Sequence, residues 1–92
     1  MPKYPSSIRD ISLIVPQKLL VNDVMVEIHL LKIEDLKDID IFDVYESLAD
    51  NKKSVSFHLM FRNDEKTLSS SEVDKYLELI KNHLQNKGYI IR

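Results

Sequence analysis

Ser54-Val55-Ser56-Phe57-His58-Leu59-Met60-Phe61-Arg62 is the stretch that decides the fold, because its side chains alternate strictly between two sides. One side is apolar throughout and consists of Val55, Phe57, Leu59 and Phe61. A period of two is typical of a strand that buries one face. We therefore predict a strand over 54–62, in a sheet with one covered face and one open face.

Two more strands are predicted upstream. Residues 9–15 also alternate, with Ile11, Leu13 and Val15 on one side, up to Pro16, which lacks a backbone donor. Between 39 and 45 the apolar residues change side, with Ile39 and Ile41 on one and Phe42 and Val44 on the other. Such a change predicts a bulged or edge strand. Polar residues 46–53 are predicted to form a loop.

Two helices are predicted from capping signals and helical spacing. Asn22 is placed as the N-cap of a short helix, whose apolar face is Val24, Ile28 and Leu31. Ser69-Ser70-Ser71-Glu72 has the spacing of a capping box, and the helix that it starts is predicted to end at Gly88. The core face of this second helix is Val73, Tyr76, Leu77, Ile80 and Leu84. Residues 89–91 are predicted to form a short last strand.

The order is β-α-β-β-α-β, which predicts an α+β, ferredoxin-like (split βαβ) fold with two helices on one face of a four-stranded antiparallel sheet. Its 92 residues fit one domain spanning 1–92. The absence of cysteine excludes a disulfide scaffold, a thiolate metal site and a cysteine nucleophile. No apolar run approaches the ~20 residues that span a bilayer, and no signal peptide opens the sequence. We therefore expect a cytoplasmic protein without membrane contact, or an organellar one whose targeting sequence is absent.

Charge is unevenly distributed. The net charge is −2 and the pI is near 5.9, which does not suggest an autonomous nucleic-acid binder. Residues 1–50 hold five Lys and Arg against ten Asp and Glu, whereas residues 51–92 hold eight against five. The second half is therefore cationic, and it allows a weak phosphate-facing patch around Lys52, Lys53, Arg62 and Lys66, although most charge runs are solvated surfaces.

The sequence holds no recognisable catalytic or metal-binding motif. Its three histidines are far apart, and one glycine cannot build a phosphate-binding loop, so we expect neither a metal site nor catalysis by this chain. The open sheet face is more informative. Its predicted side chains are Asp10, Ser12, Ser54, Ser56 and His58, joined by Asp43 and Tyr45. An aromatic plane, a carboxylate and hydroxyls can recognise single-stranded RNA, although such a face can also be merely hydrated.

Several strings in the sequence carry a resemblance to a known family. They are YPSSIRDISL (4–13), FDVY (42–45), KSVSFHLMFR (53–62), TL (67–68) before Glu72-Val73, and a terminal Ile91-Arg92. Together they resemble the ferredoxin-fold anticodon-binding domain at the C-terminus of the bacterial phenylalanyl-tRNA synthetase β subunit. The resemblance spans the chain and implies the same fold as the strand and helix patterns.

The resemblance also implies a function and site residues. It implies a non-catalytic domain that recognises the anticodon of tRNA(Phe), in an (αβ)2 enzyme whose partners are the α subunit and the rest of β. The first anticodon base of the family's substrate is a guanine. Tyr45 would stack on this base, Asp43 would accept hydrogen bonds from its Watson–Crick edge, and Ser54 would hydrogen-bond to the base or to the RNA backbone. Lys53 and Arg62 are candidate phosphate contacts. No cofactor is implied in this domain, and the parent ligase uses ATP and Mg²⁺.

Alternatives remain open at this stage. Asp43 could instead fix the bulge, Ser54 could simply begin a strand, and Arg9 fits a surface ion pair with a nearby carboxylate. The acidic loop after Tyr45 departs from the family, in which glycine is common. A ferredoxin-like interaction or regulatory ligand-binding domain is the main rival function. The length suggests an excised C-terminal fragment with an added Met1.

Overall fold

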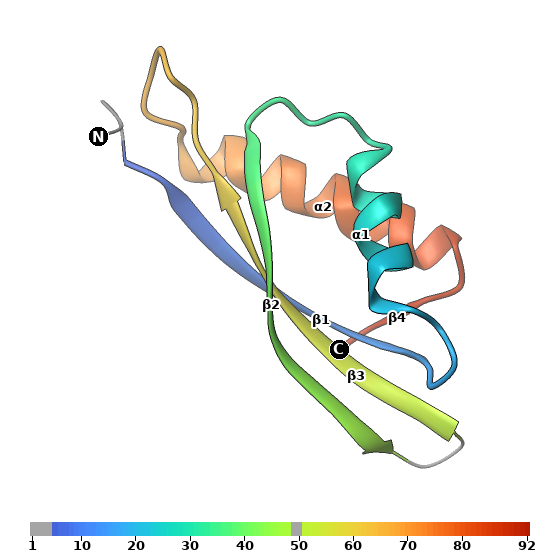
Figure 1. Ribbon diagram of the computed structural model, residues 1–92. Coiled ribbons are helices and arrows are strands. Elements are labelled where there is room, and N and C mark those ends of the chain that lie inside the picture. The colour runs from blue at the N-terminus through green and yellow to red at the C-terminus, as the bar shows by residue number, and fades with distance from the viewer. Residues whose placement is uncertain (1–4, 49–50) are drawn as a thin grey trace.

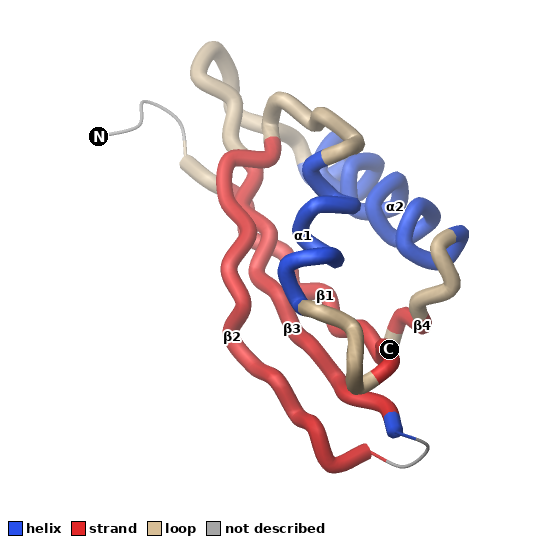
Figure 2. Tube along the Cα trace, turned by 45° about the vertical axis from the view of Figure 1, so that its right-hand side comes forward, coloured by secondary structure: helices blue, strands red, loops and turns tan. Residues whose placement is uncertain are grey.

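The computed structural model describes residues 5–48 and 51–92, with only the backbone at 47 and 48. Its elements are β1 (Ser7–Pro16), α1 (Val21–His29), β2 (Leu36–Leu48), β3 (Lys52–Phe61), α2 (Ser70–Asn86) and β4 (Ile90–Ile91). The strands form one antiparallel sheet in the order β2-β3-β1-β4. Both helices lie on the same side of this sheet (Figures 1 and 2). The predicted α+β, ferredoxin-like fold is therefore confirmed.

The core lies between the sheet and the two helices. The inward residues of the two central strands are buried as predicted, namely Ile11, Leu13, Val15, Val55, Phe57, Leu59 and Phe61. The helices contribute buried Val24, Ile28, Val73, Ile80 and Leu84, with Tyr76 and Leu77 packed at the margin. Within the described residues, no helix is long and apolar enough to cross a bilayer.

The long hairpin of β2 and β3 extends beyond the helices (Figure 1). Backbone pairing continues through polar residues, so that Leu48 still pairs with Lys52, and the predicted loop over 46–53 is shorter than expected. Because the helices do not reach this part, Ile41 and Val44 remain 38% and 41% exposed although they face the helix side. The hairpin therefore presents more surface than the rest of the sheet.

The first helix does not begin where the sequence predicted. Leu20 is its N-cap, in extended conformation and without a side-chain cap, so the assignment of Asn22 as N-cap is wrong. Starting the helix at Val21 places this residue beside the apolar face of Val24 and Ile28, and Val21 packs against the core. Partial burial of this apolar side chain offsets the roughly 1 kcal/mol that a side-chain cap contributes.

The second helix has both predicted end signals. The Ser69 hydroxyl accepts from the Glu72 amide at 3.1 Å, and the Glu72 carboxylate accepts from the Ser69 amide at 3.4 Å, which completes the capping box. A hydrogen bond from Lys66 to Glu72 lowers the pKa of this carboxyl below its ordinary value. At the other end, Gly88 has a φ of +94° and its amide bonds the Gln85 carbonyl. The next amide, that of residue 89, bonds the carbonyl of Leu84, as in a Schellman motif.

Gly88→Ala is expected to lower the free energy of unfolding by about 1 kcal/mol, because a Cβ is disfavoured in the left-handed region. No heavy atom lies within 4 Å of where this Cβ would be, so the cost is conformational rather than steric. Urea unfolding followed by circular dichroism measures it. Asn86→Ala, one exposed position inside the helix end, is the control and should be close to neutral. Equal stability of Gly88→Ala and the parent would contradict the assigned helix end.

Candidate nucleic-acid interface

A bulge in β2 brings two of the predicted site residues, Asp43 and Tyr45, to the open face of the sheet. Ile41 pairs with Phe57 on the helix side, but the register then shifts and Asp43, not Phe42, pairs with Ser56. Without the extra residue, Asp43 and Tyr45 would have the same orientation as Ile41 and point toward the helices. The predicted bulge is confirmed, and it is what turns these two side chains outward.

Tyr45 and Ser54 occupy directly paired positions on neighbouring strands. Paired residues of antiparallel strands project on the same side, so Tyr45 stands beside Ser54, with Asp43 one pair further along. Tyr45 is 54% exposed, which leaves its ring available to a ligand rather than packed in the core. Three of the predicted site residues are therefore brought together.

The last residue of the sequence joins this group. The Arg92 amide donates to the Ser12 carbonyl at 2.9 Å, continuing the pairing of β4 with β1. Its guanidinium donates to the Ser54 hydroxyl at 3.1 Å. Ser54 is only 3% exposed, whereas Arg92 is exposed, so the arginine is the outer partner of this pair. Arg92 was not among the predicted site residues, because the register of a two-residue strand leaves no periodic signal.

Hydroxyl and aromatic groups continue along the same face. The hydroxyls of Ser12 and Ser56 are hydrogen-bonded at 2.8 Å. His58 is hydrogen-bonded to Asp10 through Nδ1 at 2.5 Å, and its ring stacks on Phe42 with centroids 3.9 Å apart. The predicted placement of these polar residues on the open face is confirmed.

Phe42 and Val44 do not share a side, contrary to the sequence prediction. Phe42 is the bulged residue and lies on the open face against His58. Val44 pairs with Val55 on the helix side, because the extra residue at the bulge shifts the alternation of β2 by one position. Phe42 is 48% exposed and supplies a second aromatic surface on the open face. The sequence analysis placed Phe42 on the side opposite Ile41 but did not include it among the site residues.

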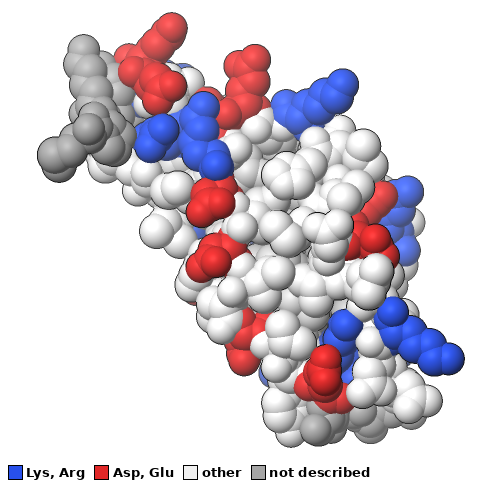
Figure 3. All heavy atoms as spheres, viewed as in Figure 1, with Lys and Arg blue, Asp and Glu red and all other residues white. Residues whose placement is uncertain are grey.

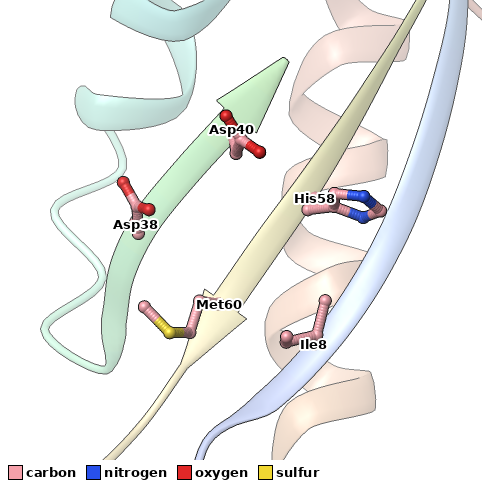
Figure 4. Close-up of a pocket in the computed structure, with 5 residues that line it drawn as sticks. All are labelled: Ile8, Asp38, Asp40, His58 and Met60. Carbon is pink, nitrogen blue, oxygen red and sulfur yellow. The ribbon is translucent and has the colours of Figure 1, made fainter. Parts of the chain in front are cut away.

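The far end of the open face is acidic. A pocket of 220 Å³ there is lined by Ile8, Asp38, Asp40, His58 and Met60. Its residues come from all three long strands, with both aspartates on β2 (Figure 4). Figure 3 shows Asp and Glu side chains along the edge of the molecule formed by β2, with Lys and Arg side chains at the hairpin end, at the opposite end and beside the helices. The carboxylates along β2 therefore disfavour phosphate groups on that side of the sheet.

The two predicted phosphate contacts lie outside the group around Tyr45. Lys53 is 7% exposed and pairs with Val15 on the helix side. Arg62 follows the opposite end of β3, roughly 25 Å from Ser54 at about 3.3 Å per strand residue. The Arg62 Nε lies 3.4 Å from an Asp64 oxygen. Arg9 has the expected ion pair, 3.8 Å from Asp74.

A partly buried polar cluster outside the open face has a structural role. Asp35 accepts from the Tyr76 hydroxyl at 2.7 Å and from the Asn63 amide at 3.0 Å. The hydrogen bond to Asp35 raises the pKa of Tyr76 to about 12, so the phenol remains a protonated donor. Both carboxylate oxygens are thus satisfied, and the cluster joins the loop before β2 to α2. Within residues 5–48 and 51–92, no group of three or more His, Cys, Asp or Glu could hold a metal ion.

Comparison with known proteins identifies the same kind of domain. A family model described as "Ferredoxin-fold anticodon binding domain" matches residues 2–92. The chain is 40% identical over 83 residues to the phenylalanine–tRNA ligase beta subunit of Francisella tularensis, an alignment that covers 86% of this chain and 10% of that protein. It is 37% identical over 89 residues to the beta subunit of Bacillus licheniformis, covering 95% of this chain and 11% of that protein.

A third relative extends the same pattern. The chain is 40% identical over 86 residues to the phenylalanine–tRNA ligase beta subunit of Carboxydothermus hydrogenoformans, covering 91% of this chain and 11% of that protein. The chain thus spans about a tenth of the length of these relatives. The match extends over nearly all of this chain and agrees with the observed order and pairing of its strands. The chain belongs to the ferredoxin-fold anticodon binding domain family.

Proposed function

We propose that this chain is the non-catalytic domain of a phenylalanine–tRNA ligase β subunit that recognises the anticodon of tRNA(Phe). One observation carries the proposal: the β2 bulge and the strand register gather Asp43, Tyr45 and Ser54 on the open face. The family membership supports it. In the proposed assembly the partners are the α subunit and the rest of β, and the ATP and Mg²⁺ used for aminoacylation act outside this domain.

Each residue of the group has a distinct proposed role. The exposed Tyr45 ring stacks on the first anticodon base, since unpaired RNA bases are commonly held on aromatic planes. The Asp43 carboxylate accepts the two N–H donors on the Watson–Crick edge of guanine. Arg92, held by Ser54, supplies hydrogen-bond donors to base or backbone oxygens.

Asp43→Asn is expected to reduce the preference for guanine over adenine at the first anticodon position by roughly 10-fold, since one good base contact contributes ~1–3 kcal/mol of discrimination. An amide presents one acceptor and one donor group, so it cannot accept both guanine donors. The measurement is the ratio of dissociation constants for two anticodon stem-loops that differ only at this base, by fluorescence anisotropy at low salt.

Asp40→Asn is the matched control, because Asp40 lies on the same strand and face but pairs with His58 at the acidic end. It removes the same charge and should leave the base preference unchanged. If both variants reduce the preference equally, Asp43 acts only through long-range charge. If the parent domain binds neither stem-loop at millimolar concentration, autonomous recognition is wrong and the rival role as a protein-contact domain is favoured.

A further inference from the structure

A hollow at the hairpin end of the sheet carries two lysines that the proposed base contacts do not use. It has a volume of 400 Å³ and is lined by Pro16, Gln17, Lys18, Asn51 and Lys52. Pro16 and Lys52 are directly paired at the end of β1 and the beginning of β3. The hollow therefore adjoins the strand segment that carries Ser54.

Lys52 faces the same side of the sheet as the proposed base contacts. Side chains alternate along β3, so Lys52 shares its side with Ser54 and Ser56, whereas the buried Lys53 points to the helices. Two residues along a strand separate their Cα atoms by about 7 Å, which is comparable to one nucleotide step. A phosphate next to a base stacked on Tyr45 thus lies within reach of the Lys52 ammonium group.

Hydrogen bonds to backbone carbonyls hold the walls of the hollow in place. The Gln17 amide donates to the Asn51 carbonyl at 2.8 Å, and the Gln17 side chain donates to the Glu46 carbonyl at 3.3 Å. These bonds tie the turn that carries Lys18 to the hairpin that carries Lys52. A site with fixed walls spends less free energy on ordering when a ligand binds.

The lysines of the hollow differ in their ion pairing from other lysines of the described residues. Lys66 and Lys87 form ion pairs with Glu72 and Glu27. Among the residues that the structure describes, no carboxylate forms an ion pair with Lys18 or Lys52. The opposite end of the open face carries exposed aspartates, which disfavour a path of the RNA backbone in that direction.

We infer that the hollow between Lys18 and Lys52 is a phosphate-binding subsite, which holds the sugar–phosphate backbone beside the base stacked on Tyr45. This inference rests on the proposed function and replaces Lys53 and Arg62 as the backbone contacts. The lysines contribute affinity without reading sequence, because phosphate contacts position a nucleic acid whereas base contacts specify it.

The test is the salt dependence of binding. Dissociation constants of the labelled anticodon stem-loop are measured from 20 to 200 mM KCl for the parent, Lys52→Gln and Lys18→Gln. Each variant is expected to weaken binding roughly 3- to 10-fold at the lowest salt and to reduce the slope of log K against log [KCl] by about 0.7. The guanine-to-adenine ratio should stay at the parent value. Lys75→Gln removes a charge from the exposed side of α2 and should leave the slope unchanged.

Replacing charged phosphates of the RNA with neutral linkages shows which phosphate Lys52 contacts. In a stem-loop with methylphosphonate linkages flanking the first anticodon nucleotide, Lys52→Gln should cause no further loss, since the phosphate charge is already absent. The subsite is refuted if both lysine variants behave as Lys75→Gln does while Tyr45→Ala still weakens binding. The proposed function fails instead if the parent does not bind or if Tyr45→Ala binds as the parent does.

Discussion

Tyr45→Ala is expected to weaken binding of the tRNA(Phe) anticodon stem-loop by roughly 10- to 100-fold, because stacking of one base on an aromatic ring contributes ~1–3 kcal/mol. The ring is more than half exposed, and the strand register places it on the open face. Few protein contacts are lost with it, so the effect falls on binding and not on folding. Fluorescence anisotropy at a fixed low salt concentration gives the affinity, and urea unfolding of the same sample gives the stability.

Tyr45→Phe separates stacking from hydrogen bonding by the hydroxyl. It keeps the aromatic plane and should bind within about 2-fold of the parent if stacking dominates. A large loss in both variants would assign the role to the hydroxyl. Unchanged affinity of Tyr45→Ala would remove Tyr45 from the interface and, with it, the main support for recognition through the open face.

Phe57→Ala is expected to lower the free energy of unfolding by about 3–5 kcal/mol, the cost of a large cavity in a packed core. Phe57 is fully buried and pairs with Ile11 on one side and with Ile41 on the other. At about 0.05–0.15 kcal/mol per residue, the whole domain is stable by only about 5–14 kcal/mol. A large part of the stability therefore depends on this ring, and the urea midpoint should fall accordingly.

Phe42→Ala is the matched control, since it removes the same atoms from a half-exposed ring. Its stacking on His58 is expected to contribute ~0.5–1.5 kcal/mol. If the two alanine variants were equally stable, the covered and open faces of the sheet would be assigned wrongly. Variants that fail to fold at 25 °C are compared through their unfolding midpoints at lower temperature.

The parts of the fold that repeat a simple period were predictable. The alternation of Val55, Phe57, Leu59 and Phe61 predicted which face is covered, and the spacing of Ser69 to Glu72 predicted the start of α2. Both patterns follow from the regular backbone geometry of a strand or a helix, which is the same at every residue of the element. Two features were not predictable in this way: the start of α1, where packing of Val21 offsets the lack of a side-chain cap, and the position of Arg92 beside Ser54, which depends on a two-residue strand pairing.

The side of the sheet on which Lys53 lies follows from the alternation of β3. The alternation of β3 extends two residues further upstream than predicted, which places Lys53 with Val55 and Lys52 with Ser54. The polar residues 46–53 predict a loop, but backbone pairing does not depend on side-chain polarity. The resemblance implied the candidate base contacts, but the side on which each lysine lies follows only from the true start of the strand at Lys52.

Because of the bulge at Phe42, the site depends on the number of residues in β2 as well as on their identity. A relative that keeps the aspartate and the tyrosine but lacks one residue between the equivalents of Ile41 and Asp43 would turn both side chains to the helix side of its sheet, away from the open face. An alignment that places a single-residue gap here would still match every site residue. A relative therefore shares the site only if its sequence aligns with this strand without a gap. The percentage of identity does not show whether this is so.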